Sequence, residues 1–494
     1  MKPKMKQIYI ILILLFSINN VLHAQDKYIE LTLPEAIELA QKHSPDAIVA
    51  RHSFRASYWN YRFFRANYLP SLTLTSNPSL NRDINKITLP DGNDTFVRQN
   101  QLNTDLALTV NQNVWFTGGN IFVKSSAQRI DLLSDKFTSY QTSPLLLGYE
   151  HSLFGYNSLK WDRRIEPIRF TEAKKQYAET LELVASETSR LYFLLATAQT
   201  NYEIAVSNYA NADTLYHYAQ GRYNIGTITE NEMLQLEINK LSEETNMMNA
   251  RIEMDNQIQE LRAYLGIVEE SSLRAKIEED IPNFQINMEK AIEFANQNSP
   301  DIETMRRKKL ESESNVAKAK GNAGLKADLY VQFGLTQTAE NIHAAYKHPL
   351  DQQYVSLGIS IPILDWGRAK GRIKVAKSNR DLVYTQVEQE RTNFEMNVRK
   401  MVKQFNLQWQ RVSISAKTNI TAQRRHDVAY KLYLLGKSTI LDLNASITEK
   451  DKAHRDYINA LSNFWTLYYG IRSLTLYDFE RDTFITEDYN LLLK

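Results

Sequence analysis

The chain has 494 residues, with 59 Lys and Arg against 57 Asp and Glu, and it contains no cysteine. The nearly balanced charge excludes the basic surplus expected of a nucleic-acid binder. The absence of thiols excludes disulfides, thiolate metal sites, cysteine nucleophiles and a lipid attached to an N-terminal cysteine. Length alone suggests about three domains. Glycine and proline are scarce, however, and no Ser/Gly-rich linker occurs, so we expect one extended architecture.

Residues 1–24 have the pattern of a secretory signal peptide. Three lysines precede an apolar run from Ile8 to Phe16, and the small Ala24 suits a cleavage site before Gln25. The apolar run is shorter than the roughly 20 residues that a membrane-spanning helix needs, and no later apolar run reaches that length. We therefore expect an exported chain that contacts a membrane only through strands or a surface helix.

An internal repeat organises the exported chain. The segment Leu31–Arg51 (LTLPEAIELAQKHSPDAIVAR) recurs as Ile286–Arg306 (INMEKAIEFANQNSPDIETMR), with Ser-Pro-Asp at the same offset. In each copy Ser suits a helix cap, Pro the first helical turn and Asp the positive end of the helix dipole. The repeat therefore predicts that a helix begins at Ser44 and another at Ser299.

We predict two structural repeats, residues 25–285 and 286–494, each with the order helix, strands, long helix, sharp turn, helix. The long helix of the first repeat, near residues 160–225, has apolar or small side chains in alternating steps of four and three, which is typical of a coiled coil. At about 1.5 Å per residue this helix is roughly 100 Å long, which no compact domain accommodates. The heptad positions are Tyr177, Leu181, Val184, Thr188, Leu191, Leu195, Ala198, Tyr202, Ala205, Tyr209, Ala212, Tyr216, Ala219 and Tyr223.

Shorter predicted helices match the long ones in total length. In the first repeat, residues 44–67 and 229–266 together have about the length of the long helix, so two stacked short helices can run antiparallel beside it. The corresponding ranges in the second repeat are 300–323 and 439–470, beside a long helix over 368–435. Gly226 and Gly436 mark the two hairpin tips, because glycine readily adopts the positive φ of a helix C-cap.

Apolar and polar residues alternate within residues 69–153 and 327–364, most clearly from Val355 to Ile363. Such alternation is typical of strands with lipid on one face and water on the other, although alternation alone favours an ordinary half-exposed sheet. The export signal, the coiled coils and the duplication favour the membrane alternative. The predicted strands are 69–80, 102–115, 120–131, 144–153, 327–337 and 353–364. We expect residues 116–119 to form a periplasmic turn. The segments expected to face the outside of the cell are 81–101, 132–143 and 338–352.

The sequence resembles the TolC-like outer-membrane efflux protein family over almost the whole exported chain. The matching motifs are AIELAQKHSPD and AIEFANQNSPD, YLPSLTLT before the first strand, SIPILDWGRAKGR after the last strand, and the tips RYNIGTITENEML and YLLGKSTILDLN. Two features depart from the family pattern. Repeat one has an extra strand pair around Phe116–Gly119, and Leu325-Lys326 stands where Leu69-Pro70 stands in the first copy.

The resemblance implies a mixed α and β fold: a long α-helical coiled-coil tunnel in the periplasm and a transmembrane β-barrel, both shared by a homotrimer. It also implies partners, namely a periplasmic adaptor protein, an inner-membrane transporter and outer-membrane lipid. The expected function is a channel subunit that exports small molecules or polypeptides from the cell. The sequence identifies neither the cargo nor the pump class.

The resemblance also implies roles at the tips. Gly226 and Gly436 would lie at the adaptor-docking end, and Asp442, Glu232 and Tyr433 would form a constriction of the tunnel. Ser438 stands where family members have an arginine, so the sequence does not determine whether one of the family's closing links is lacking here. The alternative is that the two acids are ordinary exposed helix carboxylates.

Enzyme functions find little support in the sequence. The nine histidines are scattered without metal-ligand spacing, and Gly118-Gly119 lacks the lysine of a phosphate loop. We therefore expect no catalysis and no cofactor. The rival hypothesis is a structural or adhesive periplasmic coiled coil, or the adaptor itself, and six alternating segments argue against both.

Overall fold

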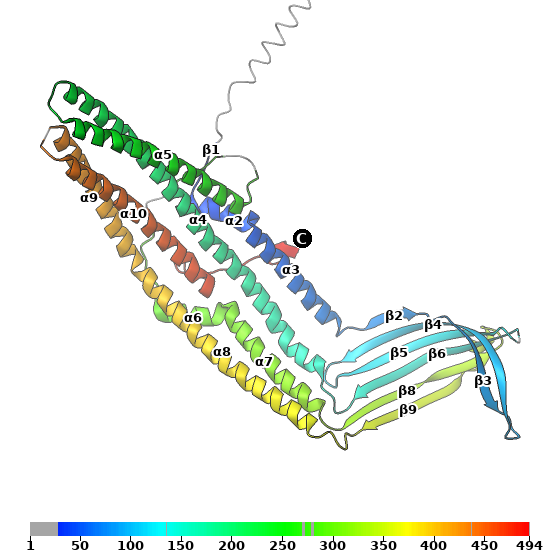
Figure 1. The fold of residues 1–494 in the computed structure, drawn as a ribbon. Coiled ribbons are helices and arrows are strands. Elements are labelled where there is room, and N and C mark those ends of the chain that lie inside the picture. The colour runs from blue at the N-terminus through cyan, green and yellow to red at the C-terminus, as the bar shows by residue number, and fades with distance from the viewer. Residues whose placement is uncertain (1–27, 135, 269–271, 278–280, 436, 494) are drawn as a thin grey trace, which may run out of the picture. The chain divides into compact units, whose positions relative to one another are not determined.

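The computed structural model describes residues 28–134, 136–268, 272–277, 281–435 and 437–493 (Figure 1). The predicted signal peptide and Gly436 lie outside these ranges. The chain forms two compact units, and each takes segments from both halves of the sequence. Unit 1 comprises Met1–Phe54, Lys174–Pro300 and Phe394–Lys494, and unit 2 comprises Arg55–Ala173 and Asp301–Asn393.

Unit 2 contains one antiparallel sheet in the order β2-β4-β5-β6-β8-β9, with β3 also paired to β4. Residues 76–78 separate β2 from β3, and Pro78 lacks the N–H of a ladder residue, so these two pieces act as one interrupted strand. The strands are β2 (Ser71–Thr75), β3 (Ser79–Thr88), β4 (Asp94–Val114), β5 (Gly119–Leu132), β6 (Phe137–Ser152), β8 (Lys326–Ala339) and β9 (Leu350–Ser360).

A strand occurs at each of the six predicted positions, and the predicted turn lies at residues 115–118, but the segments predicted to face outside are too long. Most of 81–101 belongs to the hairpin of β3 and β4, and 132–143 shrinks to residues 133–136. Alternation missed this hairpin because β3 is exposed on both faces. Backbone pairing and polar contacts between the strands hold it instead, including the ion pair of Lys86 with Asp94 at 2.5 Å.

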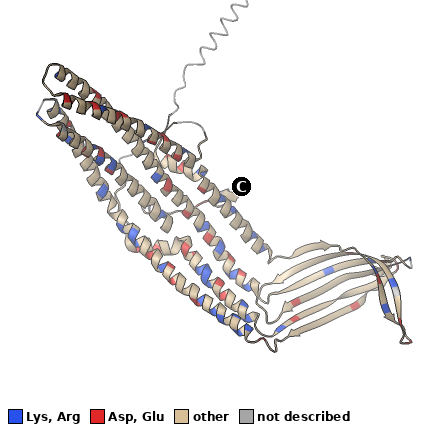
Figure 2. Cartoon of the chain, in the orientation of Figure 1, with Lys and Arg blue, Asp and Glu red and all other residues tan. Residues whose placement is uncertain are grey.

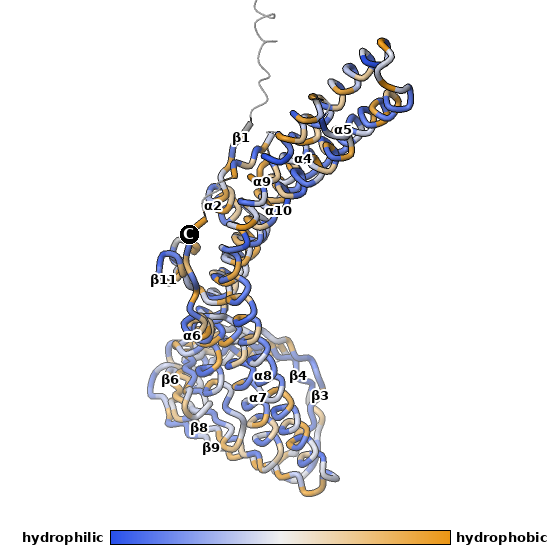
Figure 3. Tube along the Cα trace, turned by 90° about the vertical axis from the view of Figure 1, so that its left-hand side faces the viewer, coloured by the Kyte–Doolittle hydropathy of each residue, from blue (hydrophilic) through white to orange (hydrophobic). Residues whose placement is uncertain are grey.

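Large apolar side chains lie exposed along one face of this sheet. Leu106 and Leu108 are 52% and 44% exposed, whereas Ala107 between them is buried. Figure 3 colours the chain by hydropathy and shows both hydrophobic and hydrophilic residues in the part that contains the strands. Among the described residues, no helix is both long enough and apolar enough to cross a bilayer.

Four helices of unit 2 adjoin the sheet in the order α3, α4, α7, α8. Tyr61 of α3 stacks on Phe170 of α4 with ring centroids 4.5 Å apart. Arg307 of α7 donates to Glu172 of α4 at 2.6 Å, and the neighbouring Lys308 binds Glu390 of α8 at 2.8 Å. The helices are α3 (Pro45–Ala66), α4 (Ser158–Asn224), α7 (Pro300–Gly321) and α8 (Arg368–Asn406), of which α3, α4 and α8 continue into unit 1.

The predicted heptad of α4 forms the core of unit 1. Leu181, Val184, Thr188, Leu191 and Leu195 are all at most 6% exposed. Burial continues through Ala198, Ala205, Ala212 and Ala219, while Tyr223 near the tip is exposed. The other helices of this unit are α2 (Leu33–His43), α5 (Glu230–Leu265), α6 (Met288–Asn298), α9 (Gln408–Leu434) and α10 (Ile440–Thr475).

The prediction of one continuous helix over 368–435 is wrong, because α8 ends at Asn406 and α9 begins at Gln408. At the break, the N–H of Leu407 bonds to the carbonyl of Gln404, three residues back. The Asn406 side chain instead bonds to the backbone N–H and C=O of Ile286, at 2.9 and 3.0 Å. This pairing with a distant segment competes with continuation of the helix. The sequence around Asn406 contains no signal from which the break could be predicted.

Both Ser-Pro-Asp motifs begin helices as predicted. Ser44 and Ser299 are fully buried, and each lies between two consecutive helices. The Ser44 hydroxyl accepts a hydrogen bond from the N–H of Ala47 at 3.1 Å. Each serine thus ends one helix directly before the next begins, and Ser44 also caps the helix that follows it.

Two small sheets that the sequence did not predict complete unit 1. Strand β1 (Tyr28–Leu31) pairs in parallel with β7 (Ser272–Ala275), and β10 (Tyr477–Asp478) pairs with β11 (Thr483–Phe484). The buried hydroxyl of Tyr192 in α4 lies 3.1 and 2.6 Å from the carbonyl oxygens of Leu31 and Lys276. The first of these sheets is therefore fastened to the long helix.

A buried ion network joins α4 to α10. Arg472 binds Glu182 through two nitrogens, at 2.7 and 3.0 Å, and Asp478 through a third, at 2.8 Å. The three side chains are only 17%, 4% and 6% exposed. The Tyr468 hydroxyl also donates to Asp478, at 2.7 Å, and burial is the main cause that raises the pKa of this tyrosine.

We predict that Arg472→Met lowers the free energy of unfolding by about 3–5 kcal/mol, because two buried carboxylates lose their cation. Lys452→Met is the matched control on the same helix, since Lys452 pairs with Asp456 while both are largely exposed. The control is expected to cost less than about 1 kcal/mol. Guanidinium denaturation measures both, and equal losses would contradict the network's role.

Candidate functional site

At both hairpin tips, a backbone hydrogen bond spanning five residues closes the first helix. Gly226 has φ +75°, its N–H bonds to the carbonyl of Tyr223, and Thr227 N–H bonds to that of Arg222, both at 2.9 Å. This is the Schellman arrangement, in which glycine avoids the strain of positive φ. In the second tip the N–H of Lys437 bonds to the carbonyl of Leu432 at 2.9 Å, also five residues back. The predicted role of Gly436 remains a prediction.

A capping box starts the second helix of each hairpin. In α5, Thr229 accepts from the N–H of Glu232 at 3.3 Å, and its own N–H donates to the Glu232 carboxylate at 3.0 Å. In α10, Thr439 and Asp442 repeat both bonds, at 3.2 and 3.3 Å. Two of the predicted constriction residues therefore have a local structural role, which satisfies backbone groups at helix starts.

Asp442 is exposed to solvent and accepts several hydrogen bonds. The Thr439 hydroxyl donates to it at 2.6 Å, and the Ser438 hydroxyl at 3.3 Å. The Thr439 side chain first, and then its backbone N–H, lower the pKa of this carboxyl below its usual value. Ser438 thus donates a neutral hydrogen bond to Asp442.

Tyr433 is half-buried against an apolar cluster that joins the two hairpins. The cluster contains Leu215 and Leu236 from the first hairpin and Leu443 from the second. Burial is the largest cause that raises the pKa of Tyr433. Tyr433 therefore serves as part of the packing between the hairpins.

A cavity of about 360 Å³ lies between the hairpins near their tips. It brings together Glu232, Tyr433 and Ser438, but Asp442 does not line it. Arg222, which sequence reasoning overlooked, also lines the cavity. Its place in the last turn of α4, where a cation complements the helix dipole, was the available signal. The residues lining the cavity are Leu215, Tyr218, Ala219, Arg222, Thr227, Ile228, Glu232, Gln235, Leu236, Tyr433, Ser438 and Thr439.

The tips offer polar and charged groups but no metal centre. Across the described part of the chain, no three His, Asp or Glu side chains are grouped to hold a metal ion. The carboxylates at the tips bond to helix-start groups rather than to a nucleophile or a base.

A sequence model of the outer membrane efflux protein family matches residues 121–267 and 291–471, which is more than half of the chain. The chain belongs to the outer membrane efflux protein family. A comparison with curated protein sequences found no match.

Solved outer-membrane channels share the fold. The CmeC channel of Campylobacter jejuni aligns with a TM-score of 0.66 at 15% identity, over 93% of this chain and 88% of its own. VceC of Vibrio cholerae aligns with a TM-score of 0.62 at 14% identity, over 90% and 96%. The open state of MtrE of Neisseria gonorrhoeae gives 0.61 at 13% identity, over 90% and 88%. These alignments confirm the predicted fold class of a helical tunnel part with a β domain.

Membership of the family settles the coarse function. The protein is an outer-membrane efflux channel component with its helical part in the periplasm, and it is not an enzyme. The rival hypotheses of an adhesive coiled coil or an adaptor protein are therefore wrong.

Proposed function

We propose that three copies of this chain form one conduit through the outer membrane and periplasm, docked to a periplasmic adaptor and an inner-membrane transporter. The conduit exports small molecules or polypeptides. The single observation that supports the trimer best is the open sheet of unit 2, whose two edges have no partner strand among the described residues.

The edges of this sheet need partners. One edge is β2 with β3 and the other is β9, and nearly all their side chains are exposed. Unpaired N–H and C=O groups cannot remain in a bilayer, so the sheet has to close. One chain supplies six strand positions, whereas barrels with an aqueous lumen have roughly 16 to 18 strands. Three chains reach that size when β9 of each copy pairs with β2 of the next.

We predict that cysteines placed in β2 and β9 crosslink neighbouring copies. The chain has no native cysteine, so Thr73→Cys can be combined in turn with Ser356→Cys, Gly358→Cys or Ser360→Cys. Oxidation of outer-membrane fractions should give covalent dimers and trimers on denaturing gels for the pair in register. Thr73→Cys with Thr418→Cys, a helical position, is the control. Ladders that extend beyond three copies, or none for any β2/β9 pair, would refute the trimer.

The hairpin tips are the proposed docking end, because α4 and α5 lead to one tip and α9 and α10 to the other. Both tips leave apolar side chains exposed, including Ile225 at 74% and Leu441 at 73%. Exposed apolar residues at a polar, rigidly turned tip suit an adaptor made of similar helical hairpins.

We predict that Gly226→Val disrupts docking without preventing insertion of the barrel. Space is open around the glycine, so the cost of about 1–2 kcal/mol comes only from positive φ. Gly221→Ala is the control, because Gly221 also lies in open space but has an ordinary helical backbone. Cells carrying each variant are compared for heat-modifiable trimer in the outer membrane and for resistance to toxic small molecules. Normal resistance of cells that carry Gly226→Val would contradict the proposed docking role of this tip.

The constriction at Asp442, Glu232 and Tyr433 is also a proposal. In a threefold assembly the three copies of exposed Asp442 would approach the axis, where a ring of like charges attracts cations. Glu232 and Tyr433 would line the neighbouring cavity between hairpins, together with Arg222. Arg222 is the cation available at the tip in place of the arginine absent at position 438.

We predict that Asp442→Asn lowers the cation selectivity of the channel and its block by multivalent cations in planar-bilayer recordings. Asparagine keeps an oxygen that can accept from Thr439, so the cap persists while the charge is lost. Asp456→Ala, on the solvated part of the same helix, should leave both properties unchanged. If Asp442→Ala alters selectivity while Asp442→Asn does not, the residue acts only through the cap and the constriction hypothesis fails.

A further inference from the structure

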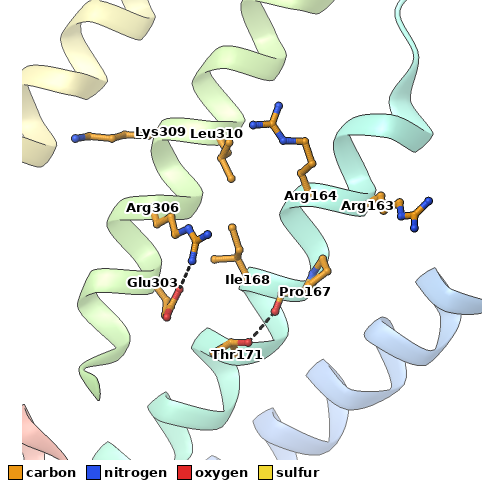
Figure 4. Close-up of a pocket in the computed structure, with 9 residues that line it drawn as sticks. All are labelled: Arg163, Arg164, Pro167, Ile168, Thr171, Glu303, Arg306, Lys309 and Leu310. Carbon is orange, nitrogen blue, oxygen red and sulfur yellow. Dashed lines mark hydrogen bonds and ion pairs between the residues drawn. The ribbon is translucent and has the colours of Figure 1, made fainter. Parts of the chain in front are cut away.

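A groove of about 720 Å³ runs between α4 and α7 in unit 2 (Figure 4). Its floor includes Ile168 and Leu310, and Arg164 from α4 and Arg306 from α7 extend beside that floor from opposite helices. The lining contains four cations but only one carboxylate, Glu303. The lining residues are Arg163, Arg164, Pro167, Ile168, Thr171, Glu303, Arg306, Lys309 and Leu310.

Two of the four cations, Arg163 and Arg164, stack on aromatic rings, whereas Lys309 pairs with Glu388 at 2.7 Å. The Arg163 guanidinium lies 4.0 Å from the ring centroid of Trp115, and that of Arg164 lies 5.0 Å from the ring of Trp161. The only acid in the lining, Glu303, reaches no closer than 4.0 Å to Arg306. Stacking on an aromatic ring orients a guanidinium but leaves its N–H donors free for an anion. The groove therefore has a surplus of positive charge in its lining.

The groove lies next to the end of the strand set. Trp115 and Phe116 belong to the turn between β4 and β5, and they are 42% and 66% exposed. The other strand-to-helix connection is similar, with Trp366 90% exposed just before α8. Exposed tryptophans at the ends of transmembrane strands mark the level of lipid headgroups. Cations within a helical turn or two of that level face phosphate groups.

A second groove strengthens this pattern. A cavity of about 400 Å³ between α7 and α8 is lined by Lys318, Arg372 and Arg380, and no carboxylate lines it. Figure 2 shows Lys and Arg along the parts of α4, α7 and α8 that adjoin the sheet. The helices nearest the membrane interface thus present repeated positive charge.

We propose that the groove between α4 and α7 binds the phosphate headgroup of an anionic phospholipid in the inner leaflet of the outer membrane, with Arg164 and Arg306 as the principal contacts. Charge complementarity and the neighbouring interfacial tryptophans favour a lipid over a free anion. This inference goes beyond the conduit proposed above, because it needs only the outer-membrane location of the chain. It gives the channel a preference for anionic lipid.

The test is a lipid titration of the purified, detergent-solubilised protein followed by native mass spectrometry. Dioleoyl-phosphatidylglycerol is expected to bind more tightly than dioleoyl-phosphatidylcholine. Each Lys or Arg near an anionic lipid surface contributes roughly a fivefold effect, so Arg164→Gln with Arg306→Gln should weaken phosphatidylglycerol binding about 25-fold. The double variant Arg411→Gln with Lys417→Gln, which removes two exposed cations of α9, should bind as the wild type does.

Two controls distinguish a bound lipid from a free anion and from loss of the fold. Circular dichroism and heat-modifiable mobility confirm that each variant is folded. Inorganic phosphate at tenfold excess over lipid should not displace phosphatidylglycerol, and displacement would overturn the proposal in favour of a free-anion site. Equal binding of the two lipids, or equal losses in both double variants, would overturn it as well.

Discussion

The buried stripe along α4 is the constraint on which the packing of unit 1 depends. Three different neighbours bond to that helix along the stripe. Gln41 of α2 donates to the carbonyl of Leu181, Ser186 donates to that of Thr466 in α10, and Tyr192 reaches the first small sheet. A heptad repeat keeps one face of a long helix turned toward its partners over its whole length. The elements that pack on α4 can therefore be short, because α4 itself extends along all of them.

Periodic features of the fold could be predicted from the sequence, and contacts between distant residues could not. The heptads of α4, the Ser-Pro-Asp starts at Ser44 and Ser299 and the glycine of the first tip follow from local rules. The ion network of Arg472 and the bond from Asn406 to Ile286 join residues 120 or more positions apart. Such pairs do not recur at a fixed spacing in the sequence. A charged or amide residue that will be buried in a pair cannot be distinguished in the sequence from one that lies on an exposed helix surface.

The hairpin of β3 and β4 shows a second limit. Alternation identifies a strand only where one face meets water and the other meets lipid or a core. Strand β3 is exposed throughout, so its sequence contains mixed polar residues on both faces. Its length follows from pairing with β4, which extends well beyond the apolar part of the sheet. Backbone hydrogen bonding therefore decides the strand ends that side-chain patterning leaves open.

At the candidate site, the sequence identified Glu232 and Asp442 and suggested that they form a constriction. It was not used to predict their second role, which is to cap helices. Thr229-x-x-Glu232 and Thr439-x-x-Asp442 have the spacing of capping boxes, which predicts local bonds that were overlooked beside the family resemblance. Arg222 was missed because its nearness to Tyr433 depends on how two hairpins pack.

The capping bonds and the proposed constriction are compatible for a physical reason. Carboxylates brought close together usually relieve their repulsion when one of them takes up a proton, which raises a pKa. Asp442 accepts hydrogen bonds from Thr439 that favour its ionised form and lower its pKa. In the proposed trimer, the cap would therefore oppose protonation and keep the charge on each copy. The repulsion would then push the helices apart, because it would not be relieved by uptake of a proton. Under this proposal, a ring of capped aspartates would be a persistent cation-attracting element that also loosens the closed tip.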